Sequence, residues 1–180
     1  MATEKLNITG WDAGWVTGSV ANVDEAIADA DAALISDGNE GAVVILDVTD
    51  SVVEDADTVT AVDVVVRIRE GAGSNGNNRI GVELLIGGTP QGARVDSANM
   101  TTSFANVSFS SVSWDADWTA AQMDGMQIQL TAVQQGKAES AVWEVDCLDV
   151  DIVYTPAPVG PPFPPSFPMP HDQDSTLLRM

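Results

Sequence analysis

Aspartate pairs are the side chains of this sequence whose spacing could bind a metal ion. Residues i and i+2 of a strand project from the same face, and Ca²⁺ takes about six to eight oxygen ligands. Asp115 and Asp117, placed between two tryptophans, are therefore the first candidates for a structural calcium site. The alternative is a solvated acidic surface, because such pairs arise readily among 27 acidic residues. The pairs are Asp29/Asp31, Asp55/Asp57, Asp115/Asp117, Asp149/Asp151 and Asp172/Asp174.

The sequence contains few residues that could form a catalytic site. The only histidine, His171, follows a proline-rich segment, and the only cysteine, Cys147, occupies an apolar position of a strand pattern. A Ser-His-Asp or Cys-His arrangement would need that histidine in a preorganised pocket. Residues 71–76 match GxGxxG, but a strand rather than a helix follows, so a loop is predicted there. We expect no catalytic residues, no cofactor and no enzymatic activity.

Charge excludes several classes of partner. Lys and Arg number 7 against 27 Asp and Glu, for a net charge of −20. Nucleic acids and anionic membrane surfaces both require a basic face, so neither is expected to bind. A single cysteine excludes an intrachain disulfide. No basic, apolar leader and no long apolar run is visible, and synthesis in a cytoplasm is expected.

Period-two alternation of apolar and polar residues dominates residues 1–155 and predicts strands. Runs at 62–68 and 80–86 predict a hairpin, and a phase slip near Cys147 and Leu148 predicts a β-bulge. Helices are predicted at 23–35 and at 118–123, the second capped by Asp117 and ended at Asp124–Gly125. The fold class is an all-β antiparallel sandwich of jelly-roll type. The other predicted strands are 42–48, 107–109 continued by 112–114, 126–131 and 143–154.

A proline-rich segment divides the chain into a β-sandwich domain, 1–155, and a tail, 156–180. Eight of the nine prolines lie between Pro156 and Pro170, which excludes helix or central strand and predicts an extended tail. We expect this tail to be an arm that contacts a neighbouring subunit or another partner; the alternative is a linker. The residues expected to make these contacts are Phe163, Phe167, Met169, Leu177 and Leu178.

Tryptophans offer a second possible binding chemistry. Exposed, coplanar indole rings on one sheet would indicate a carbohydrate-binding module. The alternative is packing at the edges of the core, which we expect for most of the five. Trp143 and Tyr154 alternate with acidic residues and are predicted to lie in the core.

The order of these segments resembles small β-sandwich structural proteins of tailed bacteriophages. The similarity covers about residues 10–155 and rests on Val23-Asp24-Glu25-Ala26, VVVRIREG, IGVELLIGG, WDADWTAAQMDGMQIQL and WEVDCLDVDIVYTP. It also implies that residues 23–36 are extended rather than helical.

This resemblance implies a virion protein made in the host cytoplasm, most simply a capsid decoration, or cement, protein. Its partners would be the major capsid protein or other virion proteins, together with copies of itself, a trimer being preferred. A tail, baseplate or fibre component is one alternative. A carbohydrate-binding module is another.

Overall fold

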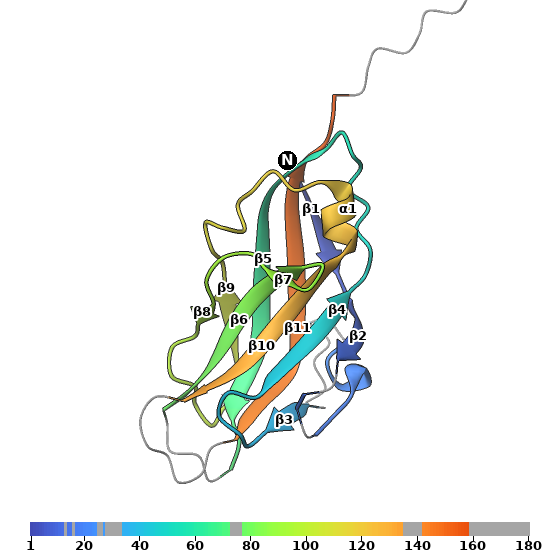
Figure 1. Cartoon of the computed structure of the whole chain (residues 1–180). Coiled ribbons are helices and arrows are strands. Elements are labelled where there is room, and N and C mark those ends of the chain that lie inside the picture. The colour runs from blue at the N-terminus through green and yellow to red at the C-terminus, as the bar shows by residue number, and fades with distance from the viewer. Residues whose placement is uncertain are drawn as a thin grey trace, which may run out of the picture.

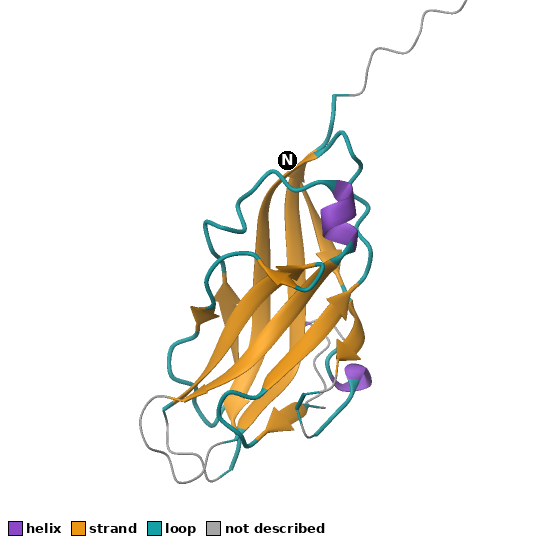
Figure 2. Cartoon of the chain, in the orientation of Figure 1, coloured by secondary structure: helices purple, strands orange, loops and turns teal. Residues whose placement is uncertain are grey.

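Two antiparallel β-sheets pack face to face in the computed structural model of this chain (Figure 1). The structure describes residues 1–12, 14–15, 17–24, 27, 34–72, 77–134 and 142–158. Nearly all of the regular structure is strand (Figure 2). The predicted all-β antiparallel sandwich is therefore confirmed.

Sheet A is built on two long strands, β5 and β11, which pair along almost their whole length. Its order is β1, β11, β5, β9, and β3 pairs with the first residues of β11. The strands are β1 (Ala2–Leu6), β3 (Ile35–Asp37), β5 (Thr58–Glu70), β9 (Ala105–Phe109) and β11 (Trp143–Thr155).

Sheet B covers the other side of the core. Its order is β2, β4, β10, β6, β7, and β8 also pairs with β6. The strands are β2 (Ile8–Asp12), β4 (Val43–Val48), β6 (Asn78–Ile86), β7 (Thr89–Pro90), β8 (Val95–Asp96) and β10 (Met126–Gln134).

The core lies between the sheets and is formed by the apolar half of each alternating pattern. The buried side chains of β5 point inward from sheet A. Those of β6 and β10 point inward from sheet B and face them across the core. Burying each such side chain contributes about 1.5–3 kcal/mol, so the alternation alone accounts for which face of each strand points inward. Buried residues of these three strands include Val62, Val64, Val66, Ile68, Ile80, Val82, Leu84, Ile128 and Leu130.

Two predictions about strands are wrong. Strands β5 and β6 do not form a hairpin, because β5 lies in sheet A and β6 in sheet B. Alternation shows that both strands bury one face, but not that these faces meet across the core. The predicted continuation at 112–114 is also wrong: β9 ends at Phe109, and the Trp114 N–H donates to the Ser111 carbonyl at 2.8 Å, closing a turn.

The second predicted helix is confirmed as α1 (Ala120–Asp124), with Gly125 following it. Its cap is Thr119 rather than Asp117, because Thr119 accepts the Gln122 N–H at 3.3 Å while Gln122 accepts the Thr119 N–H at 2.9 Å. These reciprocal bonds form a capping box. Asp117 could not form one, because the residue three positions after it is Ala120, which has no side-chain acceptor.

The first predicted helix falls mostly outside the described residues, at 25–26 and 28–33. A short 3₁₀ turn, η1 (Val20–Asn22), precedes it. Its predicted last residue, Ile35, is instead the first residue of β3 and pairs with Val145. At this position, therefore, the helix prediction is wrong.

The predicted β-bulge is confirmed within one residue. The pairing of β11 with β5 shifts register between Val145 and Cys147, so Asp146 is the extra residue. The Asp146 side chain is 0% exposed and accepts the Arg67 Nε–H at 2.6 Å. The bulge therefore holds a buried carboxylate beneath a guanidinium.

A second arginine lies beside this pair. Arg67 and Arg69 hold their guanidinium carbons 4.9 and 4.2 Å from the centre of the Phe104 ring. Arg69 also bonds Glu144, whose side chain is 15% exposed and so reaches water. The two ion pairs thus share one aromatic contact but differ in the burial of their carboxylates.

Replacing each arginine by methionine should separate these two cases. Arg67→Met leaves the Asp146 carboxylate buried without its cation and should lower the free energy of unfolding by about 3 kcal/mol. Arg69→Met is the matched control and should cost about 1 kcal/mol, because water can solvate Glu144. Urea denaturation of both variants measures the difference, and equal losses would contradict this account of Asp146.

Candidate functional site

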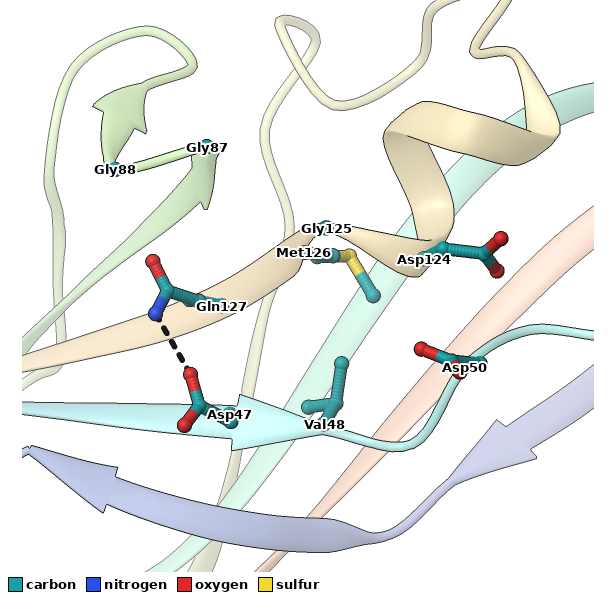
Figure 3. A pocket seen from close by; sticks show the side chains of 9 residues that line it. All are labelled: Asp47, Val48, Asp50, Gly87, Gly88, Asp124, Gly125, Met126 and Gln127. Carbon is teal, nitrogen blue, oxygen red and sulfur yellow. Dashed lines mark hydrogen bonds between the residues drawn. The ribbon is translucent and has the colours of Figure 1, made fainter.

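A hollow of about 460 Å³ lies at one end of sheet B, where three segments distant in the sequence meet (Figure 3). One wall is the end of β4 with the residues after it, another is the turn between β6 and β7, and the third joins α1 to β10. Its lining residues are Asp47, Val48, Asp50, Gly87, Gly88, Asp124, Gly125, Met126 and Gln127.

Two glycines on the rim of this hollow have positive φ angles, which glycine adopts more readily than other residues. Gly87 and Gly88 have φ angles of 55° and 75° and make the two-residue turn that joins β6 to β7. Successive positive φ angles are those of the hairpin turns that suit twisted strands. The Gly87 N–H donates to the Gly125 carbonyl at 3.2 Å, which links two of the three walls.

A carboxylate and an amide meet on the outer face of sheet B beside the hollow. Asp47 and Gln127 are directly paired across β4 and β10, and the Gln127 Nε2 donates to Asp47 Oδ1 at 2.6 Å. Both side chains are half-buried. This bond uses one of the two amide hydrogens of Gln127, so the pair still offers donor and acceptor sites to a ligand.

The other two carboxylates belong to the rim. Asp50 and Asp124 are exposed, and Asp124 Oδ1 accepts the Ser51 N–H at 3.2 Å. Figure 3 shows the Asp47, Asp50 and Asp124 side chains separated around the hollow. Across the described ranges, no three or more His, Cys, Asp or Glu side chains come close enough to hold one metal ion.

Positive charge is held elsewhere in the fold. Lys5 contacts Asp149 and Asp151 at 2.9 and 3.2 Å, and Arg94 contacts Asp96 at 2.6 Å. The hydrogen bond to Asp149 raises the pKa of Lys5, and the bond to Asp96 raises the pKa of Arg94. The described lining of the hollow contains no Lys or Arg, so its field is negative.

None of the site residues predicted from the sequence lies in this hollow. Asp115 and Asp117 are exposed in the loop before α1, and no third ligand joins them in the described part of the chain. Cys147 is 0% exposed in β11. The tail residues predicted to contact a partner, Phe163, Phe167, Met169, Leu177 and Leu178, lie outside the described residues.

The sequence contained a partial indication of the hollow. Gly87–Gly88 and Asp124–Gly125 are both recognisable as ends of elements, and the structure brings these two ends together. Asp47 and Gln127 were missed because each sits in an ordinary alternating strand. Only the register between β4 and β10 pairs them.

Four of the five tryptophans are buried, as edge-of-core packing predicts. Trp15, Trp114, Trp118 and Trp143 are between 0% and 9% exposed. Trp11 is half-buried and borders a shallow hollow of about 510 Å³ with residues 18–21. The described surface therefore offers no pair of exposed indole rings for flat stacking on a sugar chain.

Comparisons with known proteins give no family. No family model matches the chain, and no curated protein matches it. Solved structures that match include "Truncated AlyQ with CBM32 and alginate lyase domains", with 11% identity and a TM-score of 0.49 over 83% of this chain and 33% of that one. A CBM35 domain from Paenibacillus barcinonensis has 9% identity and a TM-score of 0.34 over 87% of this chain and 100% of that one.

These similarities do not say what this chain binds, since both TM-scores lie below 0.5. The chain spans only a third of the first structure. Within the residues described, no helix is long and apolar enough to cross a membrane.

Gly10 offers a test of how the Asp47–Gln127 pair is positioned. A Cβ at Gly10 would lie 2.1 Å from Asp47 Oδ2, so Gly10→Ala should turn the carboxylate away from Gln127. We expect shifted side-chain amide resonances of Gln127 and a stability loss of about 1 kcal/mol. Gly41→Ala is the control for the resonances, because nothing lies within 4 Å of its Cβ position. It is not a control for stability, because the φ of 79° at Gly41 strains an alanine there. Unchanged Gln127 resonances in Gly10→Ala would refute this geometry.

Proposed function

We propose that this chain is a non-catalytic carbohydrate-binding domain and that the Asp47–Gln127 hollow is its binding site. The observation that carries the proposal is a carboxylate and an amide side by side in an open hollow of about 460 Å³. A sugar hydroxyl both donates and accepts, as serine does, and the pair supplies both partners. Ligand sites commonly measure about 300–1,000 Å³, so the volume suits a short oligosaccharide.

Recognition at this site relies on hydrogen bonds rather than on aromatic stacking. With four tryptophans buried, the described surface lacks the flat aromatic area that a crystalline polysaccharide would require. Bonds to polar side chains in a hollow instead favour one or two sugar units of a soluble chain. The proposed ligand is therefore a soluble oligosaccharide or a chain end.

The charge of the hollow restricts the class of ligand further. Asp47, Asp50 and Asp124 surround it without a cation among the described lining residues. A polyuronate such as alginate, which the name of the first compared structure mentions, would bring its own carboxylates against these three. Like charges at contact distance are unfavourable, so the proposed ligand is a neutral sugar.

A virion structural protein is the second candidate, supported by the sequence resemblance and by one contact. The Ala157 N–H donates to Asp57 Oδ1 at 2.8 Å, which holds the start of the proline-rich segment against the loop before β5. The N-terminus lies at the same end of the sandwich (Figure 1). This arrangement suits a domain that is attached to a larger particle through one end.

Binding to a panel of neutral and anionic oligosaccharides, measured by calorimetry, tests the proposed function. We expect binding of a neutral oligosaccharide, no binding of alginate, and at least about 10-fold weaker binding by Gln127→Ala, since a lost hydrogen bond with an unsatisfied partner costs about 1–3 kcal/mol. Gln129→Ala is the control, because Gln129 bonds Glu83 on the same face but does not line the hollow.

Two results would count against a carbohydrate ligand at this site. One is equal weakening by Gln127→Ala and Gln129→Ala. The other is a wild-type chain that binds no sugar but sediments with purified phage capsids, which would favour the virion candidate.

A further inference from the structure

Strand β9 forms an open edge of sheet A. Among the described residues it pairs only with β5, in an uninterrupted register from Val64–Phe109 to Ile68–Ala105. In an antiparallel pair, alternate residues direct their backbone N–H and C=O groups away from the neighbour. Ala105, Asn106 and Ser108 are exposed, and no described strand other than β5 pairs with β9.

The other edges described here carry features that discourage such pairing, as natural sheets commonly do. Strand β1 has two adjacent charges, Glu4 and Lys5, and β2 has a register shift between Ile8 and Gly10. Strand β3 has only three residues, and β7 has two, one of them Pro90. Strand β9 has five residues, no charge, no proline and no register shift.

Charge also sets β9 apart. The 18 residues from Ser97 to Trp114 contain no Asp, Glu, Lys or Arg, in a chain whose net charge is −20. Arg67 and Arg69, on the neighbouring strand β5, are already paired with carboxylates. Two copies that meet at β9 therefore bring no carboxylate of this segment into contact.

We propose that β9 is the edge through which two copies of this chain associate, by antiparallel pairing of β9 with β9 about a twofold axis. Such a contact is self-complementary and would join the two copies of sheet A into one continuous sheet. Val112, 88% exposed just beyond β9, adds apolar area beside the paired strands. The dimer is independent of the proposed sugar site, because β9 contributes no residue to the hollow.

Sedimentation velocity of the full 180-residue chain over a range of concentrations tests the dimer. We expect a monomer–dimer equilibrium that shifts toward dimer as salt screens the repulsion between the two acidic copies. Asn106→Lys and Ser108→Lys, on the exposed side of β9, should each weaken the dimer at least about 10-fold, since like charges on facing strands repel.

Thr3→Lys is the matched control, because it places the same charge on an exposed residue of β1, the opposite edge of sheet A. It should leave the dimer intact. Hydrogen exchange gives a second readout that needs no variant: amides of residues 105–109 should become more protected as concentration rises. Circular dichroism confirms that each lysine variant is folded.

Two outcomes would overturn the proposal. The first is a wild-type chain that stays monomeric at every concentration and salt level. The second is a dimer that both β9 variants leave unchanged. If such an unchanged dimer disappears when residues 156–180 are removed, association is assigned to the proline-rich segment.

Discussion

The pairing of β5 with β11 is the constraint on which the rest of this structure depends. Each strand has 13 residues, and their inward side chains supply much of the core that sheet B covers. A strand that alternates apolar with charged residues must also accommodate charges on its outer face. Here Lys5, Arg67 and Arg69 from neighbouring strands pair with four carboxylates of β11. The β5–β11 pair therefore supplies core side chains on its inner face, and the ion pairs balance the carboxylates on its outer face.

Alternation made the long strands predictable, and local chemistry made α1 predictable, because both depend on residues close together in sequence. Strand partners were not predictable in the same way. Strands β5 and β6 follow one another but enter different sheets, which depends on where the chain crosses the sandwich. Strands β1 and β2 were missed because each is five residues long and few of its side chains are buried. Their place is decided by long-range pairing with β11 and β4.

The candidate site was even less predictable from the sequence than the strand partners. Its residues come from 47–50, 87–88 and 124–127, and each segment looks unremarkable when considered alone. A glycine pair predicts a turn, but only strand register places Gln127 beside Asp47. A one-residue slip would turn one of these side chains into the core. The site is therefore a property of the sheet and not of any local motif.

The net charge of −20 connects the two proposed surfaces. Of the few cations, three neutralise the outer face of sheet A and Arg94 pairs with Asp96. The described lining of the hollow in sheet B then keeps an uncompensated negative charge, which disfavours anionic ligands and is the basis for proposing a neutral one. Repulsion between two acidic copies is weakest where charge is absent or already balanced, and β9 with its paired arginine neighbours satisfies that condition. The same scarcity of cations therefore underlies both proposals, the neutral ligand at one surface and the second copy at the other.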